Sequence, residues 1–298
     1  MNRLAACCCA LLITTAADSL LADNWPQFRG PGGLGVSEER GLPARWSTTE
    51  NIAWKTALPG PGSSSPIVWG DRIFITCYSG YGLDESNPGN PDNLKRHLLC
   101  IQRMDGKINW DRTVNGAAAI PFDGFQALHG YASSTPATDG TLVYVFFEKE
   151  GVFAFDYSGQ QVWRSSVGEQ THSWGSGTSP VLYENLVIVN ASVEDGSLVA
   201  LDRKTGKEAW RARGMQESWS TPLLVGAVVI SYGNVEAFRI TSVPARWPRA
   251  TPCMPLAGGK TQPWPSRLAV AVMSSRSGRN RQVPTFPLPS FMVITCTG

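Results

Sequence analysis

Residues 200–210 read Ala-Leu-Asp-Arg-Lys-Thr-Gly-Lys-Glu-Ala-Trp, and this stretch decides the fold. Asp202 can accept hydrogen bonds from the backbone of its own turn, and Gly206 can take a positive φ there. A shorter form of the pattern, Gly-x-x-x-Trp, recurs over residues 106–110 and 159–163. Self-similarity at a regular spacing is typical of repeat architectures, so the sequence predicts a repeat protein.

A Ser/Thr-Pro step marks the start of each repeat. Three residues separate the Pro from a turn pair. A run of β-branched or aromatic residues follows the turn pair and predicts a strand. A third short strand and the Gly-x-x-x-Trp turn follow, and the fourth repeat matches this register only within one residue. The steps are Ser65-Pro66, Thr135-Pro136, Ser179-Pro180 and Thr221-Pro222, and the predicted third strands cover residues 99–101, 153–155, 199–201 and 236–238.

Four strands in about 40–50 residues, with a Trp at a fixed place, indicate the blade of a β-propeller. The successive Trp spacings are 56, 53 and 47 residues. We therefore predict an all-β fold, a β-propeller of four-stranded blades over residues 24–238, rather than a β-sandwich with chance repeats. The residues assigned to the structural repeat are Trp54, Trp110, Trp163, Trp210, Gly106, Gly159, Gly206 and Asp202.

The composition agrees with many short strands. The chain has 298 residues, with 30 Gly and 21 Pro, and both residue types interrupt helices and favour turns. Four repeats of this kind rarely close a ring alone, since related propellers have more than four blades. An open edge then predicts self-association.

The amino terminus has the pattern of a signal peptide, which we assign to residues 1–22. Arg3 precedes an apolar run over residues 4–17, too short to cross a bilayer and typical of a secretory leader. The protein is thus predicted to be exported, to the periplasm or beyond, without a transmembrane span. Export permits a disulfide between Cys77 and Cys100, and two separate buried thiols are the other interpretation. The sequence contains no Cys/His cluster of the kind that indicates a metal site.

The last sixty residues, 239–298, break the repeat. They form a Pro-rich stretch with eight basic and no acidic residues, whereas the first 238 residues carry a formal charge of −6. Three interpretations remain: a basic tail for an anionic surface, a natural disordered extension, or an altered reading frame that replaces further blades. The abrupt change within the fourth repeat favours the third. Nucleic acid is not an expected partner of an exported protein with scattered basic residues.

The repeat around Asp202 resembles that of pyrroloquinoline-quinone-type (quinoprotein-like) β-propellers. Residues 24–31, Asn-Trp-Pro-Gln-Phe-Arg-Gly-Pro, are similar to the amino-terminal signature of secreted bacterial members, as are residues 51–55 leading into 62–66. The resemblance covers about residues 24–238 and is specific for the fold. It implies two function classes: a binding or assembly scaffold, or a dehydrogenase of alcohols that uses pyrroloquinoline quinone (PQQ) and calcium.

No residue of this chain matches a PQQ or calcium motif of that family, so the expected function is a scaffold that binds a protein partner or a small ligand. The candidate binding residues precede the Ser/Thr-Pro steps, where successive blades connect. If these residues occupy related places in successive blades, two imidazoles and two indoles line one mouth of the channel, and such a group can bind a small ligand or a metal. The alternative is that each His caps a loop and each Trp packs between blades. These residues are His129, His172, Trp174 and Trp219.

Overall fold

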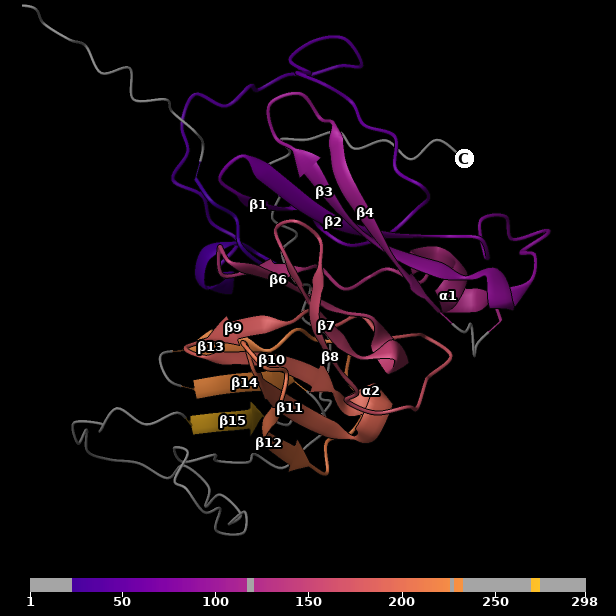
Figure 1. Ribbon diagram of the computed structural model, residues 1–298, viewed down its shortest axis with the longest axis vertical. Coiled ribbons are helices and arrows are strands. Elements are labelled where there is room, and N and C mark those ends of the chain that lie inside the picture. Colours follow the sequence, from indigo (N-terminus) through magenta and orange to yellow (C-terminus); the bar gives the residue numbers. More distant parts are fainter. Residues whose placement is uncertain (1–22, 117–120, 226–227, 233–268, 274–298) are drawn as a thin grey trace, which may run out of the picture.

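The computed structural model describes residues 23–116, 121–225, 228–232 and 269–273. Three four-stranded antiparallel sheets follow one another along the chain, each in simple up-and-down order (Figure 1). They confirm the predicted blades. Blade 1 has β1 (Ile67–Trp69), β2 (Arg72–Ser79), β3 (Lys95–Gln102) and β4 (Ile108–Asn115). Blade 2 has β5 (Ala137–Thr138), β6 (Leu142–Phe146), β7 (Val152–Asp156) and β8 (Gln161–Ser165). Blade 3 has β9 (Val181–Tyr183), β10 (Leu186–Ala191), β11 (Ser197–Asp202) and β12 (Glu208–Arg213).

Short helices occupy some of the connections. Among the described residues they are η1 (Pro31–Gly33), η2 (Pro91–Asn93), α1 (Gly124–His129), η3 (Glu148–Glu150) and α2 (Ser192–Asp195). The last two sit at equivalent places, since η3 joins β6 to β7 and α2 joins β10 to β11. No described helix is long and apolar enough to cross a membrane.

The fourth sheet departs from the blade pattern. Its strands β13 (Leu223–Val225) and β14 (Val228–Tyr232) form the expected hairpin, but β15 (Ala269–Met273) pairs with β14 in parallel. In blades 1–3 the strand at this position runs antiparallel to its neighbour. The predicted third strand of the fourth repeat, residues 236–238, lies outside the described residues.

Both faces of each central strand are buried, which is why the strands are apolar at consecutive positions. On β6, Val143 and Val145 pack against blade 1, while Tyr144 and Phe146 pack against blade 3. Successive side chains of a strand point to opposite faces, so one strand supplies two blade interfaces. The core is therefore a series of layers between sheets.

The repeat tryptophans join neighbouring blades. The indole of Trp163 in blade 2 covers Gly206 in blade 3, and its Nε1 donates to the Arg203 carbonyl at 2.8 Å. A Cβ on Gly206 would lie 2.6 Å from the ring, so only Gly fits. Trp54 covers Gly106 in the same way and donates to the Arg103 carbonyl at 2.9 Å.

Trp110 and Trp210 depart from this arrangement of an indole packed on a glycine of the next turn and bonded to a carbonyl. Trp110 Nε1 donates to the Tyr157 carbonyl at 3.0 Å, but the side chain lying over Gly159 is Arg112, not the indole. Trp210 is buried, and its Nε1 has no hydrogen-bond acceptor among the described residues. The Trp110 contact thus keeps the hydrogen bond but lacks the indole–glycine packing, and the Trp210 contact is not made among the described residues.

The turn chemistry predicted around Asp202 is confirmed. Its Oδ1 accepts from the backbone N–H groups of Lys204 and Thr205 at 3.1 and 2.9 Å and from the Thr205 hydroxyl at 2.8 Å. These bonds lower the pKa of the Asp202 carboxyl. Gly206 has a φ of 70°, a value that suits Gly in this turn.

The two cysteines of blade 1 are separate buried thiols, the second of the two interpretations. In the register of β2 and β3, Cys77 lies opposite His97 and Cys100 lies opposite Phe74. The two cysteines are therefore offset along adjacent strands rather than paired across them. Burial raises the pKa of the Cys100 thiol.

Candidate functional site: the axial cavity

The first strand of each sheet brings the Ser/Thr-Pro steps together around a common axis. The backbone N–H of Ser65 donates to Thr135 Oγ1 at 2.9 Å, that of Thr135 to Ser179 Oγ at 3.0 Å, and that of Ser179 to Thr221 Oγ1 at 3.0 Å. We call this run of bonds the hydroxyl ladder. It gives the hydroxyls of Thr135, Ser179 and Thr221 a structural role, because each one accepts a backbone N–H from the neighbouring blade.

An amino-terminal segment, residues 24–35, lies against the inner edge, and we call it the plug. Trp25 forms backbone bonds in both directions with Val68 of β1, and the Pro26 carbonyl accepts from Thr138 of β5 at 2.8 Å. Farther on, η1 contacts β13. The plug therefore contacts blade 1, blade 2 and the fourth sheet.

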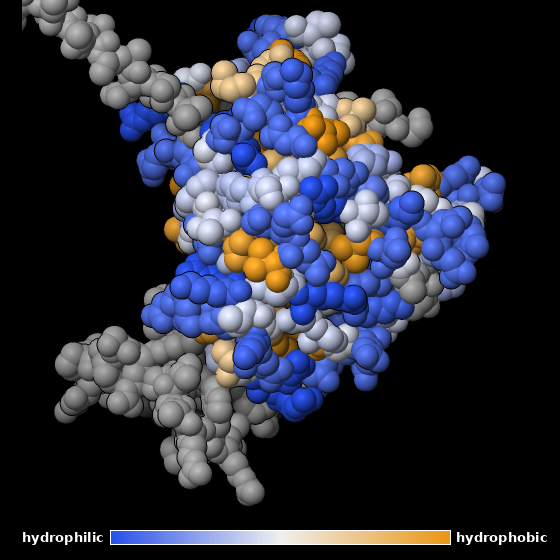
Figure 2. Space-filling model, viewed as in Figure 1, coloured by the Kyte–Doolittle hydropathy of each residue, from blue (hydrophilic) through white to orange (hydrophobic). Residues whose placement is uncertain are grey.

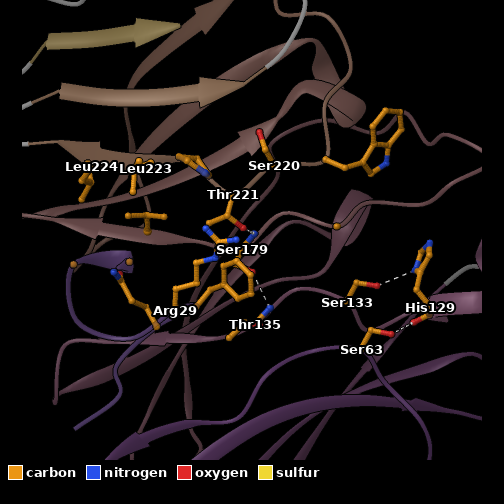
Figure 3. A pocket seen from close by; sticks show the side chains of 18 of the residues that line it. Arg29, Ser63, His129, Ser133, Thr135, Ser179, Ser220, Thr221, Leu223 and Leu224 are labelled. Carbon is orange, nitrogen blue, oxygen red and sulfur yellow. Dashed lines mark hydrogen bonds between the residues drawn. The ribbon is translucent and has the colours of Figure 1, made fainter. Parts of the chain in front are cut away.

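Between the plug and the ladder lies a cavity of about 710 Å³, within the size range of small-molecule sites. Figure 3 shows Arg29 beside Thr135, Ser179 and Thr221 at one end, and His129 with Ser63 and Ser133 at the other. The lining residues are Gln27, Phe28, Arg29, Gly32, Gly33, Ser63, His129, Ser133, Thr135, Trp174, Gly177, Ser179, Val181, Trp219, Ser220, Thr221, Pro222, Leu223 and Leu224.

Three of the four predicted binding residues line this cavity: His129, Trp174 and Trp219. His129 is the carboxyl-terminal residue of α1, and its Nε2 donates to the Trp174 carbonyl at 2.7 Å. Because a carbonyl only accepts, Nε2 carries the proton, and Nδ1 lies 2.8 Å from the Ser133 hydroxyl. Both ring nitrogens therefore brace the connections between blades.

His172 does not line the cavity but packs behind it. Its ring lies 5.1 Å from that of Trp219 and 5.5 Å from that of Trp174, and the two indoles are 4.9 Å apart. His172 Nε2 is 3.7 Å from the Glu217 carboxylate. Trp174 remains 44% exposed. The predicted cluster thus consists of contacting rings, of which the two indoles face the cavity.

A buried group of charges lies between the blades, near the same loops. Arg96 of β3 is 1% exposed and forms ion pairs with Glu148 and Glu150 of η3, each at 2.5 Å. Glu194 of α2 is also 1% exposed, and neither of its carboxyl oxygens makes a hydrogen bond with the described residues. Burial raises the pKa of Glu194 to about 8, and the neighbouring Glu148 adds to the shift.

The donors of the cavity do not fit PQQ and calcium. Ca²⁺ prefers six to eight oxygen ligands with carboxylates among them, and the described residues that line the cavity include no Asp or Glu. PQQ carries three carboxylates, whereas Arg29 is the single guanidinium among the described lining residues. In the part of the chain that the structure describes, no group of three or more His, Cys, Asp or Glu is placed to hold a metal.

Sequence reasoning missed the plug as part of the site, and with it Arg29. The signature over residues 24–31 was visible, but nothing local shows that it folds back along the axis. The sequence also shows the Ser and Thr residues of the Ser/Thr-Pro steps, but by themselves they indicate only the register of the repeat. Their common role appears once neighbouring blades are placed side by side.

Comparison with known proteins agrees with the blades. A family model described as outer membrane protein assembly factor BamB, a PQQ-type propeller model, matches residues 93–283. The chain belongs to this family. The match continues past residue 238, where the sequence repeat stops being recognisable. No curated protein matches the chain at a significant level.

Solved structures with some similarity include both function classes. Quinohemoprotein alcohol dehydrogenase ADHIIG from Pseudomonas putida HK5 is 19% identical over 63% of this chain and 26% of its own, with a TM-score of 0.41. The corresponding enzyme from Comamonas testosteroni is 18% identical over 63% and 27%, with a TM-score of 0.43. BamB from Moraxella catarrhalis is 15% identical over 67% and 50%, with a TM-score of 0.42. The chain spans about a quarter of each dehydrogenase and half of that BamB.

Proposed function

We propose that the chain is an exported binding scaffold that takes part in assembling envelope proteins. The observation that carries the proposal is the lining of the axial cavity, which includes two indoles and, among the described residues, no carboxylate for a calcium ion. Membership of the BamB family agrees with this class of function. The face of the molecule in Figure 2 is mainly hydrophilic with small separate apolar groups.

The proposal includes the domain organisation inferred from the sequence. Residues 1–22 act as a signal peptide, residues 24–238 carry the propeller repeats, and residues 239–298 are a basic Pro-rich segment. Sequencing the coding DNA across codons 230–298 in three frames, with peptide mapping of the secreted protein, tests the last boundary. A second frame that restores Asp-x-x-Thr-Gly-x-x-x-Trp supports an altered frame, and peptides that match residues 239–298 in the native protein contradict it.

The scaffold role is tested by photo-crosslinking in the cell that makes the protein. A photoreactive residue in place of Trp174, at the cavity mouth, should give a discrete cross-link to one envelope protein. The control position is Val162, an exposed apolar residue on the outer strand β8, which should give none. Equal labelling from both positions would contradict the proposal.

The dehydrogenase alternative is tested on the same secreted protein. PQQ, calcium and an artificial electron acceptor are added with several primary alcohols, and dye reduction is followed. The scaffold proposal predicts no turnover and no saturable PQQ binding by isothermal titration calorimetry. Turnover that depends on both PQQ and an alcohol would overturn it.

A further inference from the structure

The cavity is rich in hydrogen-bond donors and poor in negative charge. The described part of its lining contains the guanidinium of Arg29 and several hydroxyl groups, and no Asp or Glu. A cavity with an unbalanced set of donors favours a ligand that supplies acceptors, because a buried donor without an acceptor costs free energy.

The hydroxyl protons of the ladder have no acceptor among the described residues. Thr135, Ser179 and Thr221 each accept one backbone N–H through the side-chain oxygen. None of the three hydroxyls donates to a described residue, although each carries one proton to donate. All three line the cavity. The ladder therefore offers a row of O–H donors whose oxygen positions are fixed by the backbone.

Arg29 is held in place by an unusual backbone conformation. Its φ is 61°, in the left-handed region, which costs a non-Gly residue about 1–2 kcal/mol. The turn is fixed on both sides, since the Arg29 carbonyl accepts from Gly35 at 2.7 Å and Gly30 packs directly on the Trp25 ring. Strain of this kind is found preferentially at functional sites.

The Arg29 guanidinium has no partner of opposite charge among the described residues. Its closest described interaction is with the ring of Phe28, at 5.5 Å from the centroid. Figure 3 places Arg29 on the same side of the cavity as the hydroxyl ladder, with Leu223 and Leu224 beyond them. Val181 also lines the cavity. One positive charge and a row of hydroxyls thus lie next to an apolar wall.

We propose that the axial cavity binds a single carboxylate carried by an apolar body, with Arg29 and the hydroxyls of Thr135, Ser179 and Thr221 around the carboxylate. Guanidinium and carboxylate match in charge and planar geometry. One cation balances one negative charge, so a monocarboxylate suits the site better than a phosphate dianion. The apolar body lies against Val181, Leu223 and Leu224. This inference rests on the proposed scaffold function, because it specifies what the scaffold recognises.

Two pairs of probes test the proposal on the secreted protein by isothermal titration calorimetry. The first pair is 4-phenylbutyrate and 4-phenylbutyramide, which represent a free small acid. The second is an acetylated tetrapeptide ending in Leu, as the free acid and as the amide, which represents the end of a protein chain. At least one acid should bind tenfold or more tightly than its amide, and the pair that discriminates identifies the source of the carboxylate.

Variants then assign the discrimination to Arg29. Arg29→Gln and Arg29→Gly should both reduce the acid-to-amide ratio to about one, and the Gly variant relieves the left-handed strain, so it should fold. Arg45→Gln is the matched control, because Arg45 is exposed and lies outside the cavity lining, and it should keep the full ratio. Equal affinity for acid and amide in the wild type would overturn the proposal. So would an unchanged ratio in both Arg29 variants, or no binding of any probe.

The scaffold function can survive that failure. Cross-linking from position 174 that persists in Arg29→Gly, while no carboxylate probe binds, would reject the carboxylate site and keep the scaffold. Carboxylate binding without any cross-linked partner would reject the scaffold and keep a small-molecule site. The two results are therefore separable.

Discussion

The interface between blades 2 and 3 and the edge beyond blade 3 start from the same local motif and end differently. Trp163 and Trp210 occupy equivalent places on β8 and β12, and both are buried. Trp163 donates to the Arg203 carbonyl and covers Gly206 of the next blade. Trp210 has no acceptor among the described residues, and the sheet that follows pairs β14 with β15 in parallel.

This difference shows that the contacts that stabilise each repeat form between two neighbouring blades, not within one. Each blade supplies an indole and receives a Gly turn, and the ladder hydroxyls likewise serve the blade next door. The motif around Trp210 is complete within blade 3, yet its buried indole N–H has no acceptor among the described residues. Removing individual contacts at the complete interface should therefore cost more than equivalent removals elsewhere.

The largest effect is expected at the glycine beneath a docked indole. Gly206→Ala should lower the free energy of unfolding by about 3 kcal/mol or more, because the new Cβ adds a clash with the Trp163 ring to the left-handed strain. Gly70→Ala is the control, since Gly70 has a φ of 58° but no atom within 4 Å of the added Cβ. It should lose only about 1–2 kcal/mol. Urea unfolding measures both, and equal losses would contradict the docking role.

The next effect compares the acids at equivalent turns of blades 2 and 3. Glu150 is paired with Arg96, whereas Glu194 has no hydrogen bond in the described chain. The pKa of Glu194 is raised from 4.5 to about 8, so the folded state holds a proton that the unfolded state releases between these values. Stability should therefore fall as the pH rises from about 4.5 to 8, by at most about 1.4 kcal/mol per pH unit from this group.

Glu194→Gln should remove this slope and should be more stable than the wild type at pH 8. Urea midpoints measured from pH 5 to pH 8 for both proteins give the difference directly. A variant whose stability falls with pH as steeply as that of the wild type would show that Glu194 is ionised at little cost in the fold.

A smaller effect is expected along the hydroxyl ladder. Ser179→Ala removes the acceptor of the Thr135 N–H and should cost about 1–2 kcal/mol, because a backbone donor is left unpaired. Ser65 stands at the equivalent step, but its hydroxyl has no hydrogen bond among the described residues, so Ser65→Ala should cost less than about 0.5 kcal/mol. Thermal unfolding of the two variants, converted with the unfolding enthalpy, distinguishes them. A larger loss for Ser65→Ala would contradict the ladder.

The blades were predictable because their signals are local. Turn residues, β-branched runs and the Gly-x-x-x-Trp pattern lie within one repeat, and the turns at Asp202 and Gly206 have the predicted geometry. The site was only partly predictable. His129, Trp174 and Trp219 could be located from their place before the steps, whereas Arg29 lies far from them in sequence.

The remaining features depend on contacts between distant segments. No local pattern shows that the Arg96 side chain reaches two glutamates in the next blade, or that Arg29 adopts a positive φ. The parallel pairing of β15 with β14 was not predicted, because an up-and-down blade requires an antiparallel neighbour. Such features follow from the packing of whole blades rather than from the repeat itself.

The central claim is that docking is complete at Trp163 and incomplete at Trp210, and paired Trp→Phe substitutions test it most directly. Trp163→Phe should cost about 2 kcal/mol in urea unfolding, since ring packing is reduced and the bond to the Arg203 carbonyl is lost. Trp210→Phe loses similar packing but also removes a buried donor without an acceptor, so its cost should be smaller by about 1 kcal/mol or more. An equal or larger loss for Trp210→Phe would show that its indole N–H is bonded in the folded protein, and would contradict the account.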